Sequence, residues 1–269
     1  MIALRVGIAG FGTIGGEIAR RLDAGVAGLS LVAVATRDYH KARTGMSDFA
    51  TPAPVVNLAA LAEVADAVVE CAPAHVFADI AEPVLTSGRI LLPLSVGALL
   101  DRPDLIELAA RTGGRIVVPT GALLGLDAVR AAAEGKIDEV RIITRKPLGG
   151  LAGAPYLEAE GIDLTGLEEP RLVFDGNARD GARGFPANVN VAAALSLAGI
   201  GPDRTRLEIW ADPSLDRNVH TVVVEADSAR LTMTIENLPS AANPRTGRIT
   251  ALSAIAALRG LVSPLKVGS

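Results

Sequence analysis

Three glycines near the start of the chain have the spacing of a turn that binds phosphate groups. Gly10, Gly12 and Gly15 follow a short apolar run and precede a helical pattern. Gly10 permits a tight turn, Gly12 lets a pyrophosphate approach the backbone, and Gly15 lets the helix pack closely on the strand. Free backbone amides at the start of the helix would face the anion. The motif predicts a dinucleotide site that includes Thr13 and Ile14, with a glycine turn selected for packing alone as the alternative.

The residues after the second apolar run bear on which dinucleotide is bound. NAD sites usually place an acidic residue there, where it accepts a hydrogen bond from the ribose 2′-hydroxyl. This chain has Thr36 and Arg37 at that point, and Asp38 follows one place later. A hydroxyl and a cation suit a 2′-phosphate. We therefore expect NAD or NADP as the cofactor, with NADP accepted, unless Arg37 is merely solvated.

One of the three histidines is a candidate for proton transfer. His220 follows a polar loop and enters a β-branched strand, whereas His40 lies in a polar segment and His75 opens a helix. A histidine at such a junction can face a cleft with a pKa suited to proton transfer near neutral pH. His220 is therefore the candidate general base, and a structural histidine is the alternative.

Cationic side chains recur in the second half of the chain. Arg145 and Lys146 are adjacent, Arg183 precedes an apolar stretch, and Arg245 lies near the C-terminus. Such groups hold carboxylates through charge-assisted hydrogen bonds, although most surface cations do nothing of the kind. Arg145, Lys146 and Arg245 are the candidates for contacts with an acidic substrate.

The sequence lacks the patterns of metal-dependent and nucleophilic hydrolases. It contains no H-E-x-x-H, no paired cysteines and no G-x-S-x-G. Cys71, the only cysteine, ends a predicted strand of the first half, which argues against a dehydrogenase with a thiol nucleophile. A single cysteine forms no intramolecular disulfide, as fits a reducing cytosol. We expect no metal site and a cytoplasmic protein.

The elements that position these residues predict an α/β first domain. Apolar runs without alternation are separated by helical patterns, which indicates a Rossmann-type parallel sheet covered on both faces. Ligands bind at the carboxyl ends of such strands, so we expect Ala72 and Pro73, after the third strand, to contact the cofactor. The expected strands are 4–9, 29–35, 67–71, 90–94 and 115–118, and the expected helices are 57–64, 74–86 and 103–112.

The second half predicts a different architecture. Strands come with fewer helices between them, which is typical of an α+β domain with a mixed sheet. The tail has apolar residues at helical spacing and is expected to pack back on the first domain. The predicted domains are 1–121 for the dinucleotide and 122–245 for substrate and catalysis, with a returning C-terminal helix in 246–269. The expected strands are 140–144, 171–174, 206–211, 221–226 and 230–236.

Composition excludes several classes of protein. The 269 residues are 49% hydrophobic and 21% charged, which suits one large or two modest globular domains. A formal net charge of -4 and an aromatic content of 3% make nucleic acid an unlikely partner. The longest uncharged stretch, 185–202, contains asparagines, glycines and prolines that are costly in lipid. It is expected to be a buried helix, so no membrane association is predicted.

Several motifs occur along almost the whole chain. They are GFGTIG at 10–15, PTGALLGLD at 119–127, RKP at 145–147, FPANVNVA at 185–192, DP at 212–213 with RNVH at 217–220, and ENLPS at 236–240 with NPRT at 243–246. Together they resemble the L-aspartate dehydrogenase family. The resemblance implies NAD(P)-dependent oxidative deamination of L-aspartate to iminoaspartate, then oxaloacetate and ammonia, or the reverse reductive amination, with a link to NAD biosynthesis. It implies that His220 is the catalytic histidine and that Ala122 and Asn188 contact the cofactor, and Asn190 is an expected substrate contact.

Two other interpretations stay open at this point. One is another amino or hydroxy acid dehydrogenase of the same two-domain architecture, such as a homoserine dehydrogenase relative. The other is a protein that binds NAD(P) as a sensor without turnover. A homodimer is also expected, because a sheet in the second domain can pair across a two-fold axis.

Overall fold

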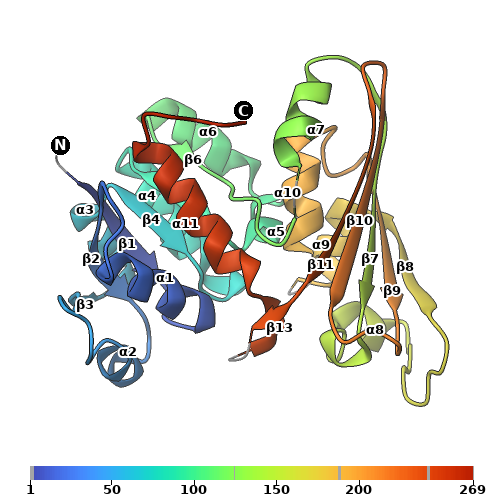
Figure 1. The fold of residues 1–269 in the computed structure, drawn as a ribbon, viewed down its shortest axis with the longest axis horizontal. Coiled ribbons are helices and arrows are strands. Elements are labelled where there is room, and N and C mark those ends of the chain that lie inside the picture. The colour runs from blue at the N-terminus through green and yellow to red at the C-terminus, as the bar shows by residue number, and fades with distance from the viewer. Residues whose placement is uncertain (1–2, 124, 187–188, 241–242, 269) are drawn as a thin grey trace. The chain divides into compact units, whose positions relative to one another are not determined.

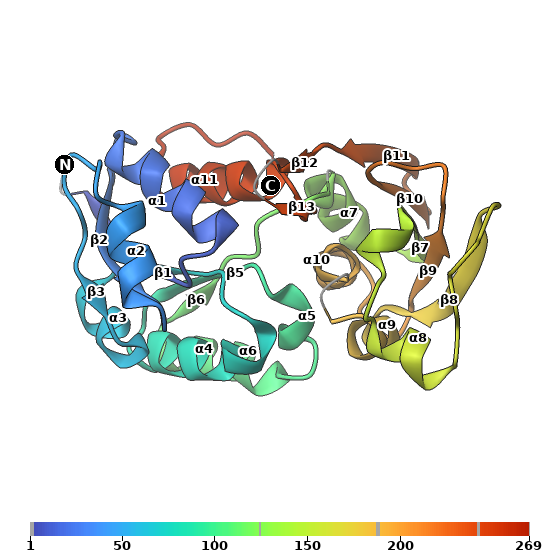
Figure 2. The same ribbon diagram turned by 90° about the horizontal axis from the view of Figure 1, so that it is seen from below.

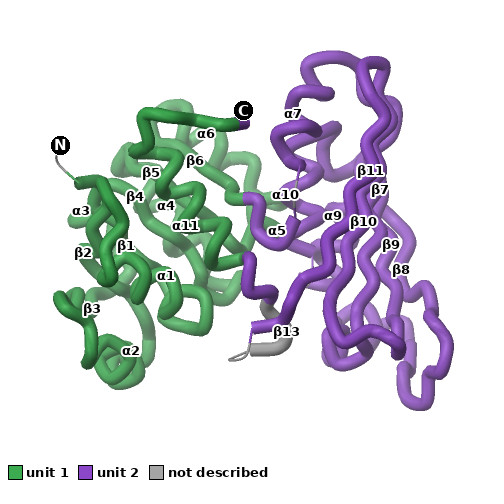
Figure 3. Tube along the Cα trace, in the orientation of Figure 1, with its two compact units in different colours: residues 1–119, 250–267 green, residues 120–249, 268–269 purple. Residues whose placement is uncertain are grey.

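A computed structural model describes residues 3–123, 125–186, 189–240 and 243–268. The chain forms two compact units, residues 1–119 with 250–267 and residues 120–249 with 268–269 (Figure 3). The sequence predicts divisions after residues 121 and 245, and the units divide after residues 119 and 249.

The first unit contains a six-stranded parallel sheet with the order β3-β2-β1-β4-β5-β6. After β1, the chain adds β2 and β3 on one side of β1 and then β4, β5 and β6 on its other side. The strand order therefore reverses between β1 and β4, where open α/β sheets bind ligands at the carboxyl ends of their strands. The sequence interpretation missed only the two-residue β3. The strands are β1 (Leu4–Ala9), β2 (Leu29–Ala35), β3 (Val55–Val56), β4 (Ala67–Glu70), β5 (Ile90–Pro93) and β6 (Arg115–Ile116).

Helices cover both faces of this sheet, as Figure 2 shows. One core cluster joins the sheet to α1 and to the C-terminal α11, through buried residues such as Ile18 and Leu258. A second cluster on the other face includes Leu61, Ile80 and Leu105 from α3, α4 and α6. Burial on both faces explains why most residues of β1, β2, β4 and β5 are apolar. The helices are α1 (Thr13–Asp23), α2 (Tyr39–Gly45), α3 (Leu58–Val64), η1 (Ala74–Val76), α4 (Phe77–Thr86), α5 (Val96–Leu99), α6 (Pro103–Thr112) and α11 (Ile249–Val262).

The second unit is built on a five-stranded mixed sheet with the order β11-β10-β7-β9-β8. The β7–β9 pair is parallel and the other pairs are antiparallel, so the predicted α+β class is confirmed. The strands are β7 (Ile137–Lys146), β8 (Arg171–Asn177), β9 (Thr205–Ala211), β10 (Asn218–Ala226) and β11 (Arg230–Asn237), with a separate ribbon of β12 (Pro239–Ser240) and β13 (Asn243–Gly247). The helices are α7 (Leu126–Ala133), η2 (Leu148–Gly150), α8 (Pro155–Ala159), α9 (Ala178–Gly184) and α10 (Asn190–Ala198).

One face of the second sheet packs against α7, α9 and α10 (Figure 1). Along β7, Val140, Ile142 and Thr144 are buried, as the two-residue repeat of a half-covered strand requires. The predicted buried helix within 185–202 is α10, and its residues 192–196 are buried. Among the described residues, no helix is long and apolar enough to cross a membrane.

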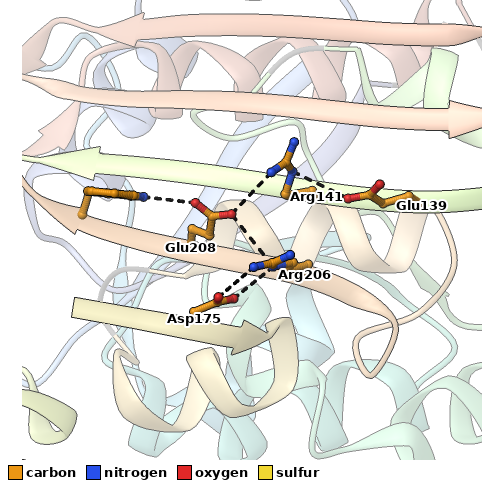
Figure 4. A network of polar contacts seen from close by, with 6 residues as sticks. Glu139, Arg141, Asp175, Arg206 and Glu208 are labelled. Atoms are coloured by element: carbon orange, nitrogen blue, oxygen red, sulfur yellow. Dashed lines mark hydrogen bonds and ion pairs between the residues drawn. The ribbon is translucent and has the colours of Figure 1, made fainter. Parts of the chain in front are cut away.

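The other face of this sheet carries a network of charges (Figure 4). Arg206 on β9 donates two hydrogen bonds to Asp175 on β8, at 3.0 and 2.7 Å. Glu208 lies 3.6 Å from Arg141 and 3.9 Å from Arg206, and its other oxygen accepts the indole N–H of Trp210 at 3.2 Å. Although it is on this face, Glu208 is only 9% exposed, because neighbouring side chains cover it.

Candidate active site

The glycine turn joins β1 to α1, and its three glycines have different steric roles. Gly10 has a φ of +102°, and a Cβ there would lie 2.5 Å from the carbonyl oxygen of Cys71. A Cβ at Gly15 would collide with the carbonyl oxygen of Gly10. Apart from its neighbours along the chain, no described residue has an atom within 4 Å of where a Cβ of Gly12 would stand. Gly10 and Gly15 therefore let strand and helix approach, and Gly12 leaves space beside the backbone.

The first turn of α1 is suited to an anion. Gly12 is its N-cap and has no side chain to accept hydrogen bonds from the first amides of the helix, which include those of Thr13 and Ile14. The first turn also has no acidic residue. Unpaired amides and the positive end of the helix dipole attract phosphate groups. The turn therefore fits the pyrophosphate of a dinucleotide.

The residues after β2 include one exposed cation beside a helix cap. The side chain of Asp38 accepts a hydrogen bond from the backbone N–H of Lys41 at 2.9 Å and so caps α2. The hydroxyl oxygen of Thr36 accepts one from the N–H of Asp38 at 3.3 Å. Arg37 is exposed. Asp38 therefore serves the helix cap, and Arg37 presents its charge to the surface next to the carboxyl end of β2.

The end of β4 contains a buried carboxylate that the sequence interpretation missed. Glu70 is fully buried and accepts hydrogen bonds from the loops that follow β4 and β5. The first of these loops contains the predicted cofactor residues Ala72, which is half-buried, and Pro73, which is exposed. The sequence did contain a signal for Glu70, because a carboxylate that ends a strand of buried apolar residues is unusual. The thiol of Cys71 next to it donates to the carbonyl oxygen of Gly10 at 3.3 Å, and burial raises its pKa, so it serves packing.

His220 lies on the helix-covered face of the second sheet. It is 2% exposed, and its Nδ1 lies 3.0 Å from the hydroxyl oxygen of Thr144, its cross-strand partner on β7. Burial, and then the charge of Lys146, lower the pKa of His220 to about 3. The sequence predicted a pKa near neutrality. The difference arises because the imidazole is enclosed and close to a cation, which the sequence did not reveal.

Lys146 is the last residue of β7 and shares the face of Thr144. It is 4% exposed, and burial lowers the pKa of its ammonium group to about 8. A buried cation beside a buried imidazole attracts a small anion, because Coulomb interactions are strong where water is excluded. Lys146 and His220, predicted as substrate-binding and catalytic residues, are thus brought close together.

Arg145 has different surroundings from Lys146. Alternate residues of a strand point to opposite faces, and Arg145 is exposed whereas Lys146 is buried. The Arg145 guanidinium forms an ion pair with Asp212 at 3.0 Å. Asp212 is 1% exposed, and its other oxygen accepts hydrogen bonds from the amide and hydroxyl of Ser214 at 3.0 and 2.6 Å. Arg145 therefore holds the loop after β9, and a substrate contact would have to share this ion pair.

The remaining predicted residues lie in several segments. The carbonyl oxygen of Ala122 accepts a hydrogen bond from the side-chain amide of Asn237 at 3.1 Å. Asn237, which the sequence interpretation missed, is 3% exposed, so it fixes the Ala122 carbonyl from a buried position. Asn190 is the half-buried first residue of α10. Asn188 lies outside the described residues, as does the side chain of Arg245.

Comparisons with known proteins cover both units. A family model described as "Homoserine dehydrogenase, NAD binding domain" matches residues 10–119, and one described as "Aspartate dehydrogenase, C-terminal" matches residues 127–261. The L-aspartate dehydrogenase of Bradyrhizobium diazoefficiens is 54% identical over 99% of this chain and 94% of its own length. The chain belongs to the L-aspartate dehydrogenase family.

Other members of the L-aspartate dehydrogenase family agree. L-aspartate dehydrogenase 3 of Bordetella bronchiseptica is also 54% identical, over 99% of this chain and 98% of its own. The crystal structure of aspartate dehydrogenase from Thermotoga maritima superposes with a TM-score of 0.71 over 98% of this chain and 99% of that one. At 22% identity this likeness concerns the fold. The predicted family and two-part fold are confirmed.

Proposed function

We propose that this protein catalyses the NAD(P)-dependent oxidative deamination of L-aspartate. The substrate loses a hydride from its α-carbon and a proton from its amine to give iminoaspartate, which water converts to oxaloacetate and ammonia. The reverse direction is reductive amination. Similarity at 54% identity over 99% of the chain to proteins named L-aspartate dehydrogenase carries this choice of substrate.

The glycine turn supports the choice of cofactor. When bound, the dinucleotide supplies the acceptor for the hydride. Its pyrophosphate is held by the turn from Gly10 to Gly15, through the amides at the start of α1. Thr36 and Arg37 hold the ribose next to adenine and allow a 2′-phosphate, so NADP is accepted as well as NAD. Additional contacts come from the predicted residues of the two carboxyl-end loops and of the Phe-Pro-Ala-Asn motif, namely Ala72, Pro73, Ala122 and Asn188.

Lys146 holds a carboxylate of the substrate. Its ammonium group is buried and its pKa is only about 8, so the free site destabilises the charge. A carboxylate placed beside the ammonium group favours its protonated form. Selectivity for an acidic substrate then follows, because an uncharged analogue brings no negative charge to this buried cation. Asn190 and Arg245 remain proposed as further contacts, and Arg145 only if it shares its ion pair.

His220 acts as the base. If Nδ1 carries the hydrogen and donates it to Thr144, then Nε2 is free to accept a proton from the substrate ammonium or from the attacking water. The pKa of about 3 arises because burial, and then the charge of Lys146, oppose protonation of the imidazole. The negative charge of bound aspartate counteracts this effect and raises the pKa of the imidazole. Proton transfer is therefore coupled to substrate binding.

The experiment is a panel of amino and hydroxy acids with NAD and with NADP, followed by absorbance of the reduced nicotinamide. We expect turnover with L-aspartate, and with oxaloacetate plus ammonia in reverse. His220→Ala should lower kcat by about 100-fold or more and leave the dinucleotide Kd unchanged. Preference for another acid would select a different dehydrogenase. Dinucleotide binding without turnover of any acid would indicate a sensor.

We also propose that two copies of the chain associate through the face of the second sheet that carries the network of Figure 4. Ile143, Trp210 and Val223 are partly exposed on this face, and both signs of charge lie among them. A two-fold axis brings each charge near those of the other copy, so a mixed surface can be complementary to itself. Sedimentation should give a dimer for the wild type and a monomer for Val223→Arg.

The product and its location complete the proposal. Iminoaspartate that is consumed before hydrolysis would supply pyridine nucleotide biosynthesis, as the family resemblance implies. A cytoplasmic location fits the single cysteine, whose thiol is used in packing against Gly10. Fractionation of cells and accumulation of labelled nicotinamide dinucleotide from aspartate test these two points.

A further inference from the structure

The carboxylate of Glu70 holds two loops at the edge of the first sheet where strands β4 and β5 end. One of its oxygens accepts hydrogen bonds from the backbone N–H of Ala72 at 2.9 Å and from the hydroxyl of Ser95 at 3.0 Å. The other accepts from the N–H of Ser95 at 2.9 Å and from that of Leu94 at 3.2 Å. Glu70 is 0% exposed. Its side chain therefore connects the loop after β4 to the loop after β5.

The same arrangement reaches the glycine turn. A Cβ on Gly10 would lie 2.5 Å from the carbonyl oxygen of Cys71 and 2.9 Å from the amide nitrogen of Ala72. The turn therefore packs directly on the Cys71–Ala72 peptide, whose N–H is held by Glu70. The carboxyl ends of β1, β4 and β5 are thus linked through one buried carboxylate.

A charged carboxylate is poorly suited to a purely structural position at this depth. Burial raises the pKa of Glu70, and the hydrogen bonds from Ser95, Ala72 and Leu94 oppose that effect. An apolar side chain would fill the space without desolvating a charge. What it could not do is fix two loop backbones at once, because only a carboxylate offers acceptors on both oxygens.

We propose that Glu70 is a positioning residue for the dinucleotide, which holds the Cys71–Ala72 peptide and the loop that begins at Ser95 in the conformation that the cofactor requires. The proposal rests on the proposed function, since the ligand of this edge is taken to be NAD(P). Glu70 itself need not touch the cofactor. It acts through the backbone that does.

Glu70→Gln removes the charge and one of the two acceptor oxygens of the side chain but keeps its shape. The amide of Glu70→Gln cannot accept, so one of the two pairs of donors loses its partner. The hydroxyl of Ser95 can rotate and accept instead, whereas the N–H of Ala72 cannot. The substitution should therefore release the loop next to Gly10. Loss of a charge-assisted hydrogen bond is worth roughly 10- to 100-fold in affinity when its whole effect falls on the ligand.

The same strand supplies a matched control. Asp66 precedes β4, at the opposite edge of the sheet, and its carboxylate likewise accepts hydrogen bonds from the backbone and guanidinium of Arg5 and from Arg89, at 2.7–3.2 Å. Asp66→Asn removes a comparable set of charged hydrogen bonds from the amino-terminal end of β4. Both variants should lower Tm. Only Glu70→Gln should change the cofactor site.

The experiment titrates wild type, Glu70→Gln and Asp66→Asn with NADH and NADPH, by fluorescence of the reduced nicotinamide. We expect the Kd to rise about 10-fold or more in Glu70→Gln and to stay within about 2-fold in Asp66→Asn. In steady state, Glu70→Gln should raise KM for the dinucleotide and leave KM for aspartate unchanged. Equal Kd values for Glu70→Gln and wild type, at any Tm, would overturn the proposal.

Ser95→Ala gives a second test if Glu70→Gln does not fold. It removes the hydroxyl, which also lies 3.1 Å from the carbonyl oxygen of Ala72, and keeps the three backbone amides that donate to Glu70. We therefore expect a rise in Kd of about 3-fold, with Tm almost unchanged. An unaltered Kd would count against the positioning role. Failure of the wild type itself to bind either dinucleotide would instead refute the cofactor assignment on which the proposal rests.

Discussion

Replacement of Lys146 by methionine should make the protein more stable and inactive. The ammonium group of Lys146 is 4% exposed, and its pKa falls from the ordinary 10.5 to about 8 because of burial. At about 1.4 kcal/mol for each tenfold change in proton affinity, this difference corresponds to about 3 kcal/mol at neutral pH. Methionine has a similar length and no charge to desolvate. The ammonium's own polar contacts are lost as well, so the expected gain is roughly 1–3 kcal/mol.

The pH dependence identifies the cause. The folded state holds its Lys146 proton less tightly than the unfolded state, so wild-type stability rises as the pH increases from about 8 to the ordinary pKa of 10.5. Above that pH the side chain is neutral in both states and the penalty is gone. The advantage of Lys146→Met should therefore be largest below pH 8 and disappear near pH 11. Groups that do not interact with Lys146 cancel in the comparison of the two proteins. His220, whose pKa is lowered by burial and then by Lys146, affects the comparison only below its ordinary pKa of 6.5.

Urea denaturation at pH 7 and at pH 10.5, followed by circular dichroism, measures the gain in the free energy of unfolding and its dependence on pH. A gain of 1–3 kcal/mol raises the Tm of the second unit by roughly 2–12 °C. Lys136→Met is the control, because that lysine is 75% exposed and its replacement should change stability by less than about 0.5 kcal/mol. Activity with aspartate should fall by about 100-fold or more while NADH still binds. A Lys146→Met protein that is less stable than wild type, or equally favoured at both pH values, would refute this reasoning.

Three other substitutions probe the scaffold. Gly15→Ala should abolish NADH binding and lower stability by about 1–3 kcal/mol or more, measured by titration and urea denaturation, because its Cβ collides with the Gly10 carbonyl; unchanged binding would show that the turn tolerates a wider approach. Phe185→Ala should lower the free energy of unfolding by about 3–5 kcal/mol, since the ring is fully buried and within 5.6 Å of two other aromatic centroids; a loss below about 1 kcal/mol would mean that the core collapses into the space. Asp212→Asn should cost about 1–3 kcal/mol in the same assay by breaking the ion pair with Arg145, with stability equal to wild type as the contrary result.

The fold could be predicted largely because its signals are local. The glycine turn occurs between an apolar strand and a helix, and the later strands β2, β4 and β5 are mostly apolar because both faces of the sheet are covered. The strand β3 was missed because two residues, Val55 and Val56, carry no periodicity. Their place in the sheet comes from pairing with β2, which is a tertiary interaction.

The candidate site was predicted less completely, since its geometry depends on distant pairs. His220 and Thr144 are 76 residues apart in the sequence and meet through the register of β7 and β10. The depressed pKa of His220 follows from that register and from Lys146, so no local pattern could show it. The different burial of Arg145 and Lys146 could have been predicted from the sequence. Alternate residues of β7 are buried, beginning with Val140 and Ile142, and Lys146 falls on the same face as these two.

Glu70 in the first unit and Lys146 in the second are both buried and ionisable, but their surroundings differ. Glu70 is surrounded by four hydrogen-bond donors, so its charge is satisfied by the protein itself and serves to hold backbone in place. At Lys146 burial is the dominant influence on the pKa, and an anion placed beside the ammonium group would stabilise its charged form. The first arrangement is preorganisation, which lowers the free energy needed to bind a cofactor. In the proposed function the second arrangement favours a dicarboxylate over a neutral amino acid, because the carboxylate of the substrate offsets the cost of burying the ammonium group.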